Sequence, residues 1–285
     1  MIYLKRFYFA SEEDEDDFLL GLKTASFNNA YPFRLFSSKS WANVDFKDIT
    51  ILNGSNGSGK STALNVIAEK IRAKRECAFN RSGVYEHYLA LCRAEFSKHR
   101  CIERKIITSD DVFNCMIDLR LINSGMEHKR MNLFDEYEER RNKHFQLKSL
   151  DQLDELRSFN EAKAKNRDEF VRARLVGEIT SRSNGESALQ YFANKIDCDG
   201  LYLLDEPENS LSPKKQLELK QFIEDSVRFY RCQFIIATHS PFLLSIKDAA
   251  IYDMDSEVVR QKPWTELECV RTYRRFFATY FKDCF

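Results

Sequence analysis

One stretch of this sequence places closely spaced glycines directly before a lysine and a serine. Residues 54–61 read GSNGSGKS and fit the pattern G-x-x-x-x-G-K-[ST], between a strand predicted over 46–53 and a helix predicted over 62–72. Glycines let backbone N–H groups converge on phosphate oxygens, Lys60 can reach the β and γ phosphates, and Ser61 can hold Mg²⁺. We therefore expect a nucleotide site formed by Asn53, Gly54, Ser55, Asn56, Gly57, Ser58, Gly59, Lys60, Ser61 and Thr62.

Two carboxylates follow a short apolar run farther along the chain. Residues 201–204 read LYLL, and Asp205 and Glu206 come next, before Pro207 ends the predicted strand. The carboxyl end of such a buried strand lies beside the phosphate loop in a parallel sheet. We expect Asp205 to act on Mg²⁺ and Glu206 to polarise the attacking water. The alternative is a strand that merely ends in two solvated acids.

Three further motifs complete a series. They read SNGE at 183–186, ENSLSP at 208–213 and IIATHSP at 235–241. With the two motifs above, and in this order, they resemble the ATP-binding cassette (ABC) superfamily, specifically soluble ABC-type AAA ATPases of the DNA-repair and overcoming-lysogenization branch. The resemblance implies that His239 contacts the γ-phosphate, so that Lys60, Glu206 and His239 would be the catalytic residues. A lone histidine is otherwise most often structural.

The resemblance also implies a site shared between two subunits. Ser183, Gly185 and Glu186 would belong to a signature that closes over the nucleotide held by the other copy. Asn184 stands where the family usually has glycine, and an N-G pair by itself is a common turn. Residues 208–213 would communicate between the two sites.

Two family features have no obvious equivalent. The family carries a Mg²⁺-contacting glutamine after its first helix, but no Gln precedes Gln146 here. Asp110 or Asp111 could replace it as a metal ligand, or these acids could instead cap the following helix. Tyr31 and Phe33 are candidates for stacking on the base, with packing in the core as the alternative.

These patterns predict an α/β fold, a P-loop NTPase of the ABC ATPase type with a mostly parallel sheet, an N-terminal antiparallel β region and a helical insertion lobe. We expect a single domain over 1–285, with the α/β core at 1–110 and 183–285 and the lobe at 111–182. The strand predicted over 2–9 is followed by an acidic loop at 12–17. A tail helix within 264–285 is expected to pack on the core.

The composition limits the possible partners. Lys and Arg total 44 and Asp and Glu total 44, so the chain has no net charge that would draw it to nucleic acid or a membrane. The eight scattered cysteines favour reduced thiols and a cytoplasmic location. Apolar runs such as 201–204 and 234–237 are far shorter than the roughly 20 residues that span a bilayer, so we expect no membrane association. Few residues follow His239, which favours a separate protein effector.

The expected cofactors are ATP and Mg²⁺, and the expected state is a homodimer formed on ATP binding that switches a partner or a nucleic-acid transaction. The alternative is a nucleotide-gated regulatory module for a separately encoded effector, of a defence or toxin–antitoxin kind, with slow incidental hydrolysis. Binding of DNA is possible by family analogy alone. A small-molecule kinase would not need the motifs at 183–186 and 235–241.

Overall fold

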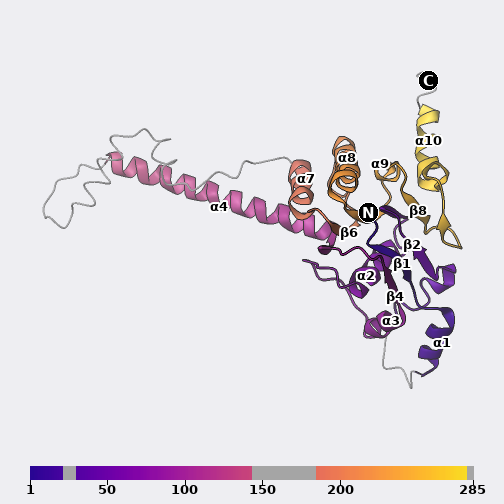
Figure 1. Cartoon of the computed structure of the whole chain (residues 1–285). Helices are drawn as coiled ribbons and strands as arrows, with labels where there is room; N and C mark the ends of the chain where they lie inside the picture. The colour runs from indigo at the N-terminus through magenta and orange to yellow at the C-terminus, as the bar shows by residue number, and fades with distance from the viewer. Residues whose placement is uncertain (22–29, 143–183, 281–285) are drawn as a thin grey trace. The chain divides into compact units, whose positions relative to one another are not determined.

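The computed structural model describes residues 1–21, 30–142 and 184–280. It divides into two compact units, one formed by Met1–Phe113 with Asn184–Phe285 and the other by Asn114–Ser183. The first unit holds every strand that the structure describes (Figure 1).

The larger sheet of the first unit has six strands in the order β5-β6-β7-β3-β8-β9. All pairs are parallel except β8 with β9. Every residue of β3 and β7 is buried, as expected for parallel strands covered on both faces. The strands are β3 (Ile49–Asn53), β5 (Glu103–Thr108), β6 (Gly200–Asp205), β7 (Gln233–Thr238), β8 (Ala250–Asp253) and β9 (Arg260–Gln261).

The smaller sheet is antiparallel, with the order β2-β1-β4. Its strands are β1 (Leu4–Tyr8), β2 (Asn43–Asp45) and β4 (Arg93–Phe96). A mostly parallel sheet accompanied by an N-terminal antiparallel sheet confirms the predicted fold class.

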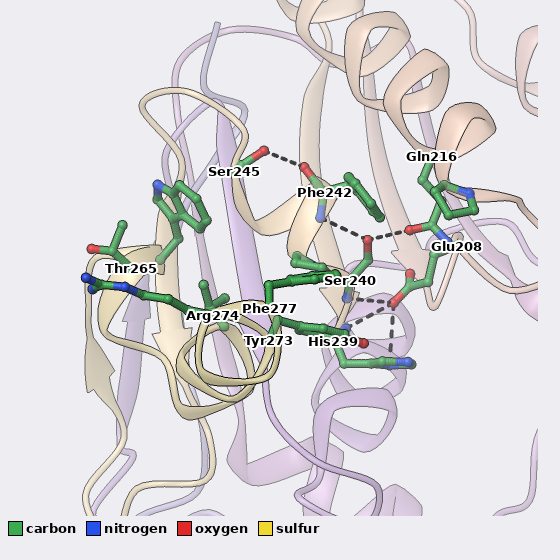
Figure 2. A pocket seen from close by; sticks show the side chains of 14 residues that line it. Glu208, Gln216, His239, Ser240, Phe242, Ser245, Thr265, Tyr273, Arg274 and Phe277 are labelled. Atoms are coloured by element: carbon green, nitrogen blue, oxygen red, sulfur yellow. Dashed lines mark hydrogen bonds and ion pairs between the residues drawn. The ribbon is translucent and has the colours of Figure 1, made fainter. Parts of the chain in front are cut away.

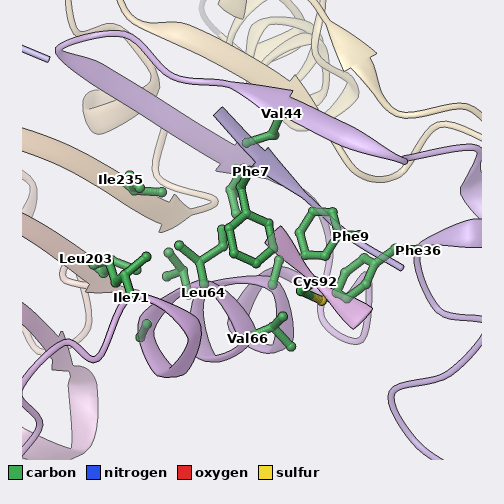
Figure 3. Close-up of a cluster of buried hydrophobic side chains, with 14 of the residues drawn as sticks. Phe7, Phe9, Phe36, Val44, Leu64, Val66, Ile71, Cys92, Leu203 and Ile235 are labelled. Atoms are coloured by element: carbon green, nitrogen blue, oxygen red, sulfur yellow. The ribbon is translucent and has the colours of Figure 1, made fainter. Parts of the chain in front are cut away.

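The main core lies between these two sheets, around helix α2 (Lys60–Lys70). Phe7 of β1, Leu64 of α2 and Leu203 of β6 belong to one buried cluster (Figure 3). Six of the eleven residues of α2 are buried, and this packing fixes the position of its first turn, which carries the lysine and serine of the phosphate-binding pattern.

The other described helices belong to the first unit, except α4, most of which belongs to the second. No helix in the described ranges has the length and apolar character needed to cross a membrane. These helices are α1 (Glu12–Gly21), α3 (Tyr85–Leu91), α4 (Ser109–Asn142), α7 (Asn184–Lys195), α8 (Pro213–Tyr230), α9 (Pro241–Leu244) and α10 (Glu268–Tyr280), with short 3₁₀ turns η1 (Ser37–Lys39) and η3 (Trp264–Glu266).

The acidic segment at 12–17 is helical, so the predicted loop is wrong. The Ser11 hydroxyl accepts a hydrogen bond from the backbone of Asp14 at 3.2 Å and donates one to its carboxylate at 2.6 Å, which caps α1. Acids in a first turn are also favoured by the helix dipole. Glu15 is fully buried and accepts from Arg34 N at 2.8 Å and Ser37 Oγ at 2.6 Å.

The tail forms helix α10, but none of its residues is buried, so the expected packing on the core is wrong. Leu267, just before the helix, is fully buried and fills the core position instead. Phe276 packs against Phe277 and Tyr280, with ring centroids 5.6 and 4.8 Å apart, while all three stay at least half exposed.

The lobe expected at 111–182 begins within the long helix α4, whose 34 residues span about 50 Å. Residues 143–182 of this expected lobe lie outside the described residues.

Gln233 joins the two sheets through its side-chain amide. Its Oε1 accepts from the backbone N–H groups of Tyr3 at 2.8 Å and Leu4 at 2.9 Å. Its Nε2 donates to the carbonyls of Leu4 at 2.9 Å and Lys47 at 3.0 Å. The side chain is fully buried. Without it, the backbone groups of Tyr3 and Leu4 would have neither this hydrogen-bond partner nor water in its place.

We expect Gln233→Leu to lower the free energy of unfolding by about 3 kcal/mol, because it orphans buried backbone groups. Urea unfolding followed by circular dichroism measures this change. Gln221→Leu is the matched control, since Gln221 lies exposed on α8. Equal unfolding midpoints for the two variants would contradict this role of Gln233.

Candidate nucleotide site

The carboxyl ends of β3, β6 and β7 align at one edge of the large sheet. Asn53 pairs with Thr238, and Asp205 pairs with Ala237, so the last residues of the three strands are neighbours. The loop 54–59 continues from β3, the acids follow β6, and His239 follows β7. Parallel pairing therefore brings together three segments that are far apart in the sequence.

The loop has the backbone that its glycines predict. Gly57 has φ +84° and Gly59 has φ +102°, in the left-handed region that favours glycine. A Cβ on Gly54 would collide with the side chain of Ser58. The glycine spacing is thus a requirement of this loop conformation.

Lys60 lies folded back over the loop and is only 4% exposed. Its Nζ donates to the carbonyls of Gly54 at 2.8 Å and Ser55 at 3.1 Å. It also lies 3.7 Å from Glu206 Oε1. The ammonium group is therefore held inside the site by two carbonyls and one carboxylate.

Ser61 and Asp205 are in direct contact, with Ser61 Oγ donating to Asp205 Oδ1 at 2.9 Å. Burial is the main cause that raises the pKa of Asp205 to about 6; the charge of Glu206 acts in the same direction, and the Ser61 hydrogen bond and Lys60 act against it. A hydroxyl and a carboxylate are hard oxygen donors of the kind that Mg²⁺ takes.

The loop also contains an unsatisfied group. Ser58 Oγ is buried and has no hydrogen-bond partner in the described part of the chain. Buried polar atoms are normally paired. An orphaned hydroxyl in the loop, together with the oxygen donors of Ser61 and Asp205, fits a magnesium–nucleotide complex as the missing group.

Glu206 adopts a left-handed backbone, with φ +47°. This conformation costs a non-glycine residue about 1 kcal/mol. Two hydrogen bonds maintain it, from Glu206 N to Ala237 O at 2.9 Å and from Asn209 N to Glu206 O at 3.1 Å. The turn separates the Glu206 carboxylate from the line of β6 and directs it to within 4 Å of Lys60 and His239.

His239 is positioned by Glu208, which is 5% exposed. Glu208 Oε1 accepts from His239 N at 3.0 Å and Ser240 N at 3.2 Å (Figure 2). It also accepts from Thr238 Oγ1 at 2.5 Å. The His239 Nδ1 atom lies 3.5 Å from Glu208 Oε1 and 3.8 Å from Glu206 Oε1. A buried carboxylate thus fixes the turn that carries the histidine.

A pocket of about 730 Å³ opens on the other side of this turn. His239 and Ser240 line one wall, and Tyr273 and Phe277 of α10 line another (Figure 2). The exposed surface of the lining is mostly apolar, which suits an apolar ligand better than a triphosphate. The glycine loop is therefore the better candidate for a phosphate site.

Only two of the three candidate signature residues can be located in the fold. Ser183 lies outside the described residues, and Gly185 and Glu186 occupy the first turn of α7. A Cβ on Gly185 would lie 3.4 Å from Lys215 of α8.

Asp111 is engaged in local structure. Its Oδ2 accepts from Thr108 N at 2.7 Å and Thr108 Oγ1 at 2.8 Å, and its Oδ1 accepts from Cys77 N at 2.9 Å. Thr108 Oγ1 in turn accepts from Asp111 N at 3.3 Å, which is a reciprocal cap on α4. Asp110 is exposed. This geometry favours the capping interpretation over a metal ligand.

The two aromatic candidates for base stacking lie in different surroundings. Phe33 is buried and stacks on Phe18 with centroids 4.9 Å apart, as a core residue does. Tyr31 is 42% exposed, and its hydroxyl hydrogen-bonds Thr62 Oγ1 beside the loop.

Two residues that contact the loop were missed from sequence. Asp255 accepts hydrogen bonds from Ser55, and Lys39 donates one to Ser58 O. The acids after the apolar run AIY at 250–252 resemble those after LYLL, and that similarity was the available signal for Asp255. The sequence contained no such signal for Lys39, because its contacts with Ser58 and Met254 arise only from the tertiary fold.

The raised pKa of Asp205 predicts a pH-dependent cost in the metal-free protein. Its folded pKa of about 6 exceeds the unfolded 3.8, so the ionised carboxylate destabilises the fold above pH 6 and the penalty fades as the pH falls toward 4. We expect the free energy of unfolding of Asp205→Asn to exceed that of the wild type by about 2 kcal/mol at pH 7.5 without Mg²⁺. Near pH 4 the two values should differ little.

Denaturant titrations in chelator at several pH values measure this difference. Glu257→Gln is the control, because Glu257 is an exposed acid. A gain of stability that does not vary with pH would contradict the assigned pKa.

One protein-family model matches part of the chain. Residues 111–245 match the family model described as "AAA domain, putative AbiEii toxin, Type IV TA system". No curated protein gives a significant sequence match.

Several solved structures are similar to this one at low identity. The SMC head domain from Thermotoga maritima is 15% identical, with 92% of this chain and 98% of that chain covered and a TM-score of 0.42. An Smc head domain with an extended coiled coil, bound to the C-terminal domain of ScpA from Pyrococcus furiosus, is 13% identical, with 98% and 99% covered and a TM-score of 0.41. The dimeric ATP-binding cassette MJ0796 bound to ADP and Pi is 14% identical, with 78% and 88% covered and a TM-score of 0.36.

The family match spans the segments with the signature, the paired acids and the histidine, while the glycine loop precedes it. The motifs, the sheet that aligns them and the family match over 111–245 support a P-loop ATPase of the ABC-type AAA kind.

Proposed function

We propose that this chain binds and hydrolyses Mg-ATP at the loop 54–59, and that two copies come together around the nucleotide as a switch. The observation that carries the proposal is the convergence of Lys60, Ser61, Asp205 and Glu206 at one sheet edge. The contacts are 2.9 Å from Ser61 Oγ to Asp205 Oδ1 and 3.7 Å from Lys60 Nζ to Glu206 Oε1.

Binding would use the groups nearest the loop. Its N–H groups and Lys60 would donate hydrogen bonds to the phosphates, and Lys60 would exchange its carbonyl contacts for phosphate oxygens. Ser61 and Asp205 would hold Mg²⁺, which when bound neutralises phosphate charge. Tyr31, next to Thr62, is the better placed candidate to contact the base.

Hydrolysis would depend on Glu206 and His239. Glu206 Oε1 lies between the ammonium of Lys60 and the imidazole of His239, and its carboxylate can accept a hydrogen bond from the attacking water. His239, held at its backbone by Glu208, would donate to the terminal phosphate oxygens.

The dimer is proposed because one chain supplies only part of the site. Ser183, Gly185 and Glu186 would contact the nucleotide of a second copy, as the resemblance implies. A single subunit would therefore hydrolyse ATP slowly.

A second candidate function is a nucleotide-gated regulator of a separate effector, in which hydrolysis is incidental. The toxin–antitoxin description of the matching family favours it. Hydrolysis that rises when a co-expressed partner protein is added would support this regulatory role. Stimulation by duplex DNA that weakens with salt would support a nucleic-acid transaction instead.

We expect the specific ATPase activity to rise with protein concentration, because the active site needs two copies. Ser183→Arg should abolish this rise, whereas Ser181→Arg, which adds the same charge two positions away, should retain it. Glu206→Gln should lower the turnover number at least about 100-fold while ATP still drives dimer formation. Steady-state phosphate release and sedimentation velocity measure these quantities.

Two results would contradict the proposal. A rate per subunit that stays constant with concentration and is unchanged by Ser183→Arg would exclude the shared site. Full turnover in Glu206→Gln would remove the assigned base.

A further inference from the structure

The turn after β8 contacts the start of the loop 54–59 through Asp255. Both carboxylate oxygens of Asp255 accept from Ser55 N, at 2.8 and 2.9 Å. Asp255 Oδ1 also accepts from Ser55 Oγ at 2.8 Å. The first variable residue of the loop is therefore held at both its backbone and its side chain.

The same turn reaches the far end of the loop through Lys39. Lys39 Nζ donates to Ser58 O at 2.8 Å and to Met254 O at 2.7 Å. Lys39 is itself tied to the region beyond the turn, since Val259 N donates to Lys39 O at 3.2 Å. One ammonium group thus connects the loop to the residue preceding Asp255.

Burial and hydrogen bonds fix the conformation of the turn that makes these contacts. Met254 is fully buried, and its N–H donates to Asn53 O at 2.8 Å. The Asp253 carboxylate accepts from Ser256 Oγ at 2.8 Å and from Lys262 Nζ at 2.5 Å, and it accepts from Asp255 N at 3.3 Å. These bonds fix the position from which Asp255 and Lys39 act.

The charges involved argue for a specific role. A carboxylate beside a triphosphate site opposes binding through like-charge repulsion, so Asp255 is electrostatically unfavourable unless it does something else. What its geometry provides is three hydrogen bonds from the two donors of Ser55. Lys39 and Lys60 bind the carbonyls of Ser58, Gly54 and Ser55, so the loop is held in one conformation from both ends.

We propose that Asp255 and Lys39 form a clamp that holds the loop 54–59 in its nucleotide-accepting conformation before the nucleotide arrives. This inference rests on the proposed nucleotide site and assigns positioning residues to it. Preorganisation of this kind lowers the conformational cost of binding. Its loss should therefore appear in nucleotide affinity rather than in the chemical step.

The test compares Asp255→Ala with Glu257→Ala, which removes an exposed acid from the same segment. We expect Asp255→Ala to raise the dissociation constant and the KM for Mg-ATP about tenfold, with kcat at saturation within about twofold of wild type. Glu257→Ala should change neither. Asp255→Asn, which can still accept one hydrogen bond, should recover part of the affinity.

A readout without nucleotide separates this inference from the proposed function. Amide hydrogen exchange of the peptide around Ser55 should be faster in Asp255→Ala and in Lys39→Met, and unchanged in Glu257→Ala. The double variant should lose less affinity than the product of the two single losses, because both residues act on one loop.

The outcomes are distinct. If wild type binds Mg-ATP and Asp255→Ala binds equally well with equal exchange around Ser55, the clamp is wrong and the nucleotide site stands. If wild type fails to bind Mg-ATP, the proposed function is wrong. A fall in kcat with unchanged KM would also overturn the clamp, since it indicates a smaller folded fraction. Should Asp255→Ala fail to fold, Ser55→Ala and Asp255→Asn provide the same affinity and exchange tests.

Discussion

The parallel pairing of β3 with β7, and of β7 with β6, is the constraint on which the rest of the site depends. Its register places Asn53 beside Thr238 and Asp205 beside Ala237, so that three distant segments leave the sheet at one edge. Gln233 at the start of β7 fastens this sheet to the antiparallel one, with α2 packed between them. A register shift of one residue would turn Asp205 away from Ser61.

Around that edge, hydrogen bonds and ion pairs between neighbouring groups hold the charged side chains in place. Lys60 is held by carbonyls and by Glu206, and Asp205 is held by Ser61, while Glu208 secures the backbone of His239. Burial raises the pKa of Asp205, and Lys60 and the Ser61 hydrogen bond offset only part of this effect. Binding of Mg-ATP would lower this electrostatic cost, because Mg²⁺ would stabilise the ionised Asp205 carboxylate. The phosphate oxygens would in turn pair with the Lys60 ammonium.

The local motifs could be predicted from sequence because glycine spacing and apolar runs determine backbone shape nearby. The loop, the acids after β6 and the histidine after β7 all follow from such patterns. The acidic segment at 12–17 was misassigned because its charge masked the Ser11 cap, and α10 was misassigned because its aromatic residues suggested burial. Lys39 and Asp255 were missed: the acids after the apolar run at 250–252 were the one available signal for Asp255, and the contact of Lys39 with Met254 joins residues that lie 215 positions apart.

The central claim is that the loop 54–59 with Lys60, Ser61 and Asp205 is a magnesium–nucleotide site. Calorimetric titration of Mg-ATP into wild type and Lys60→Ala, with and without chelator, tests it most directly. The account predicts saturable binding of one nucleotide per chain by wild type, a loss of affinity of about 100-fold in Lys60→Ala, and weaker binding when Mg²⁺ is removed. Equal affinity in the two proteins, or no binding by wild type, would contradict it.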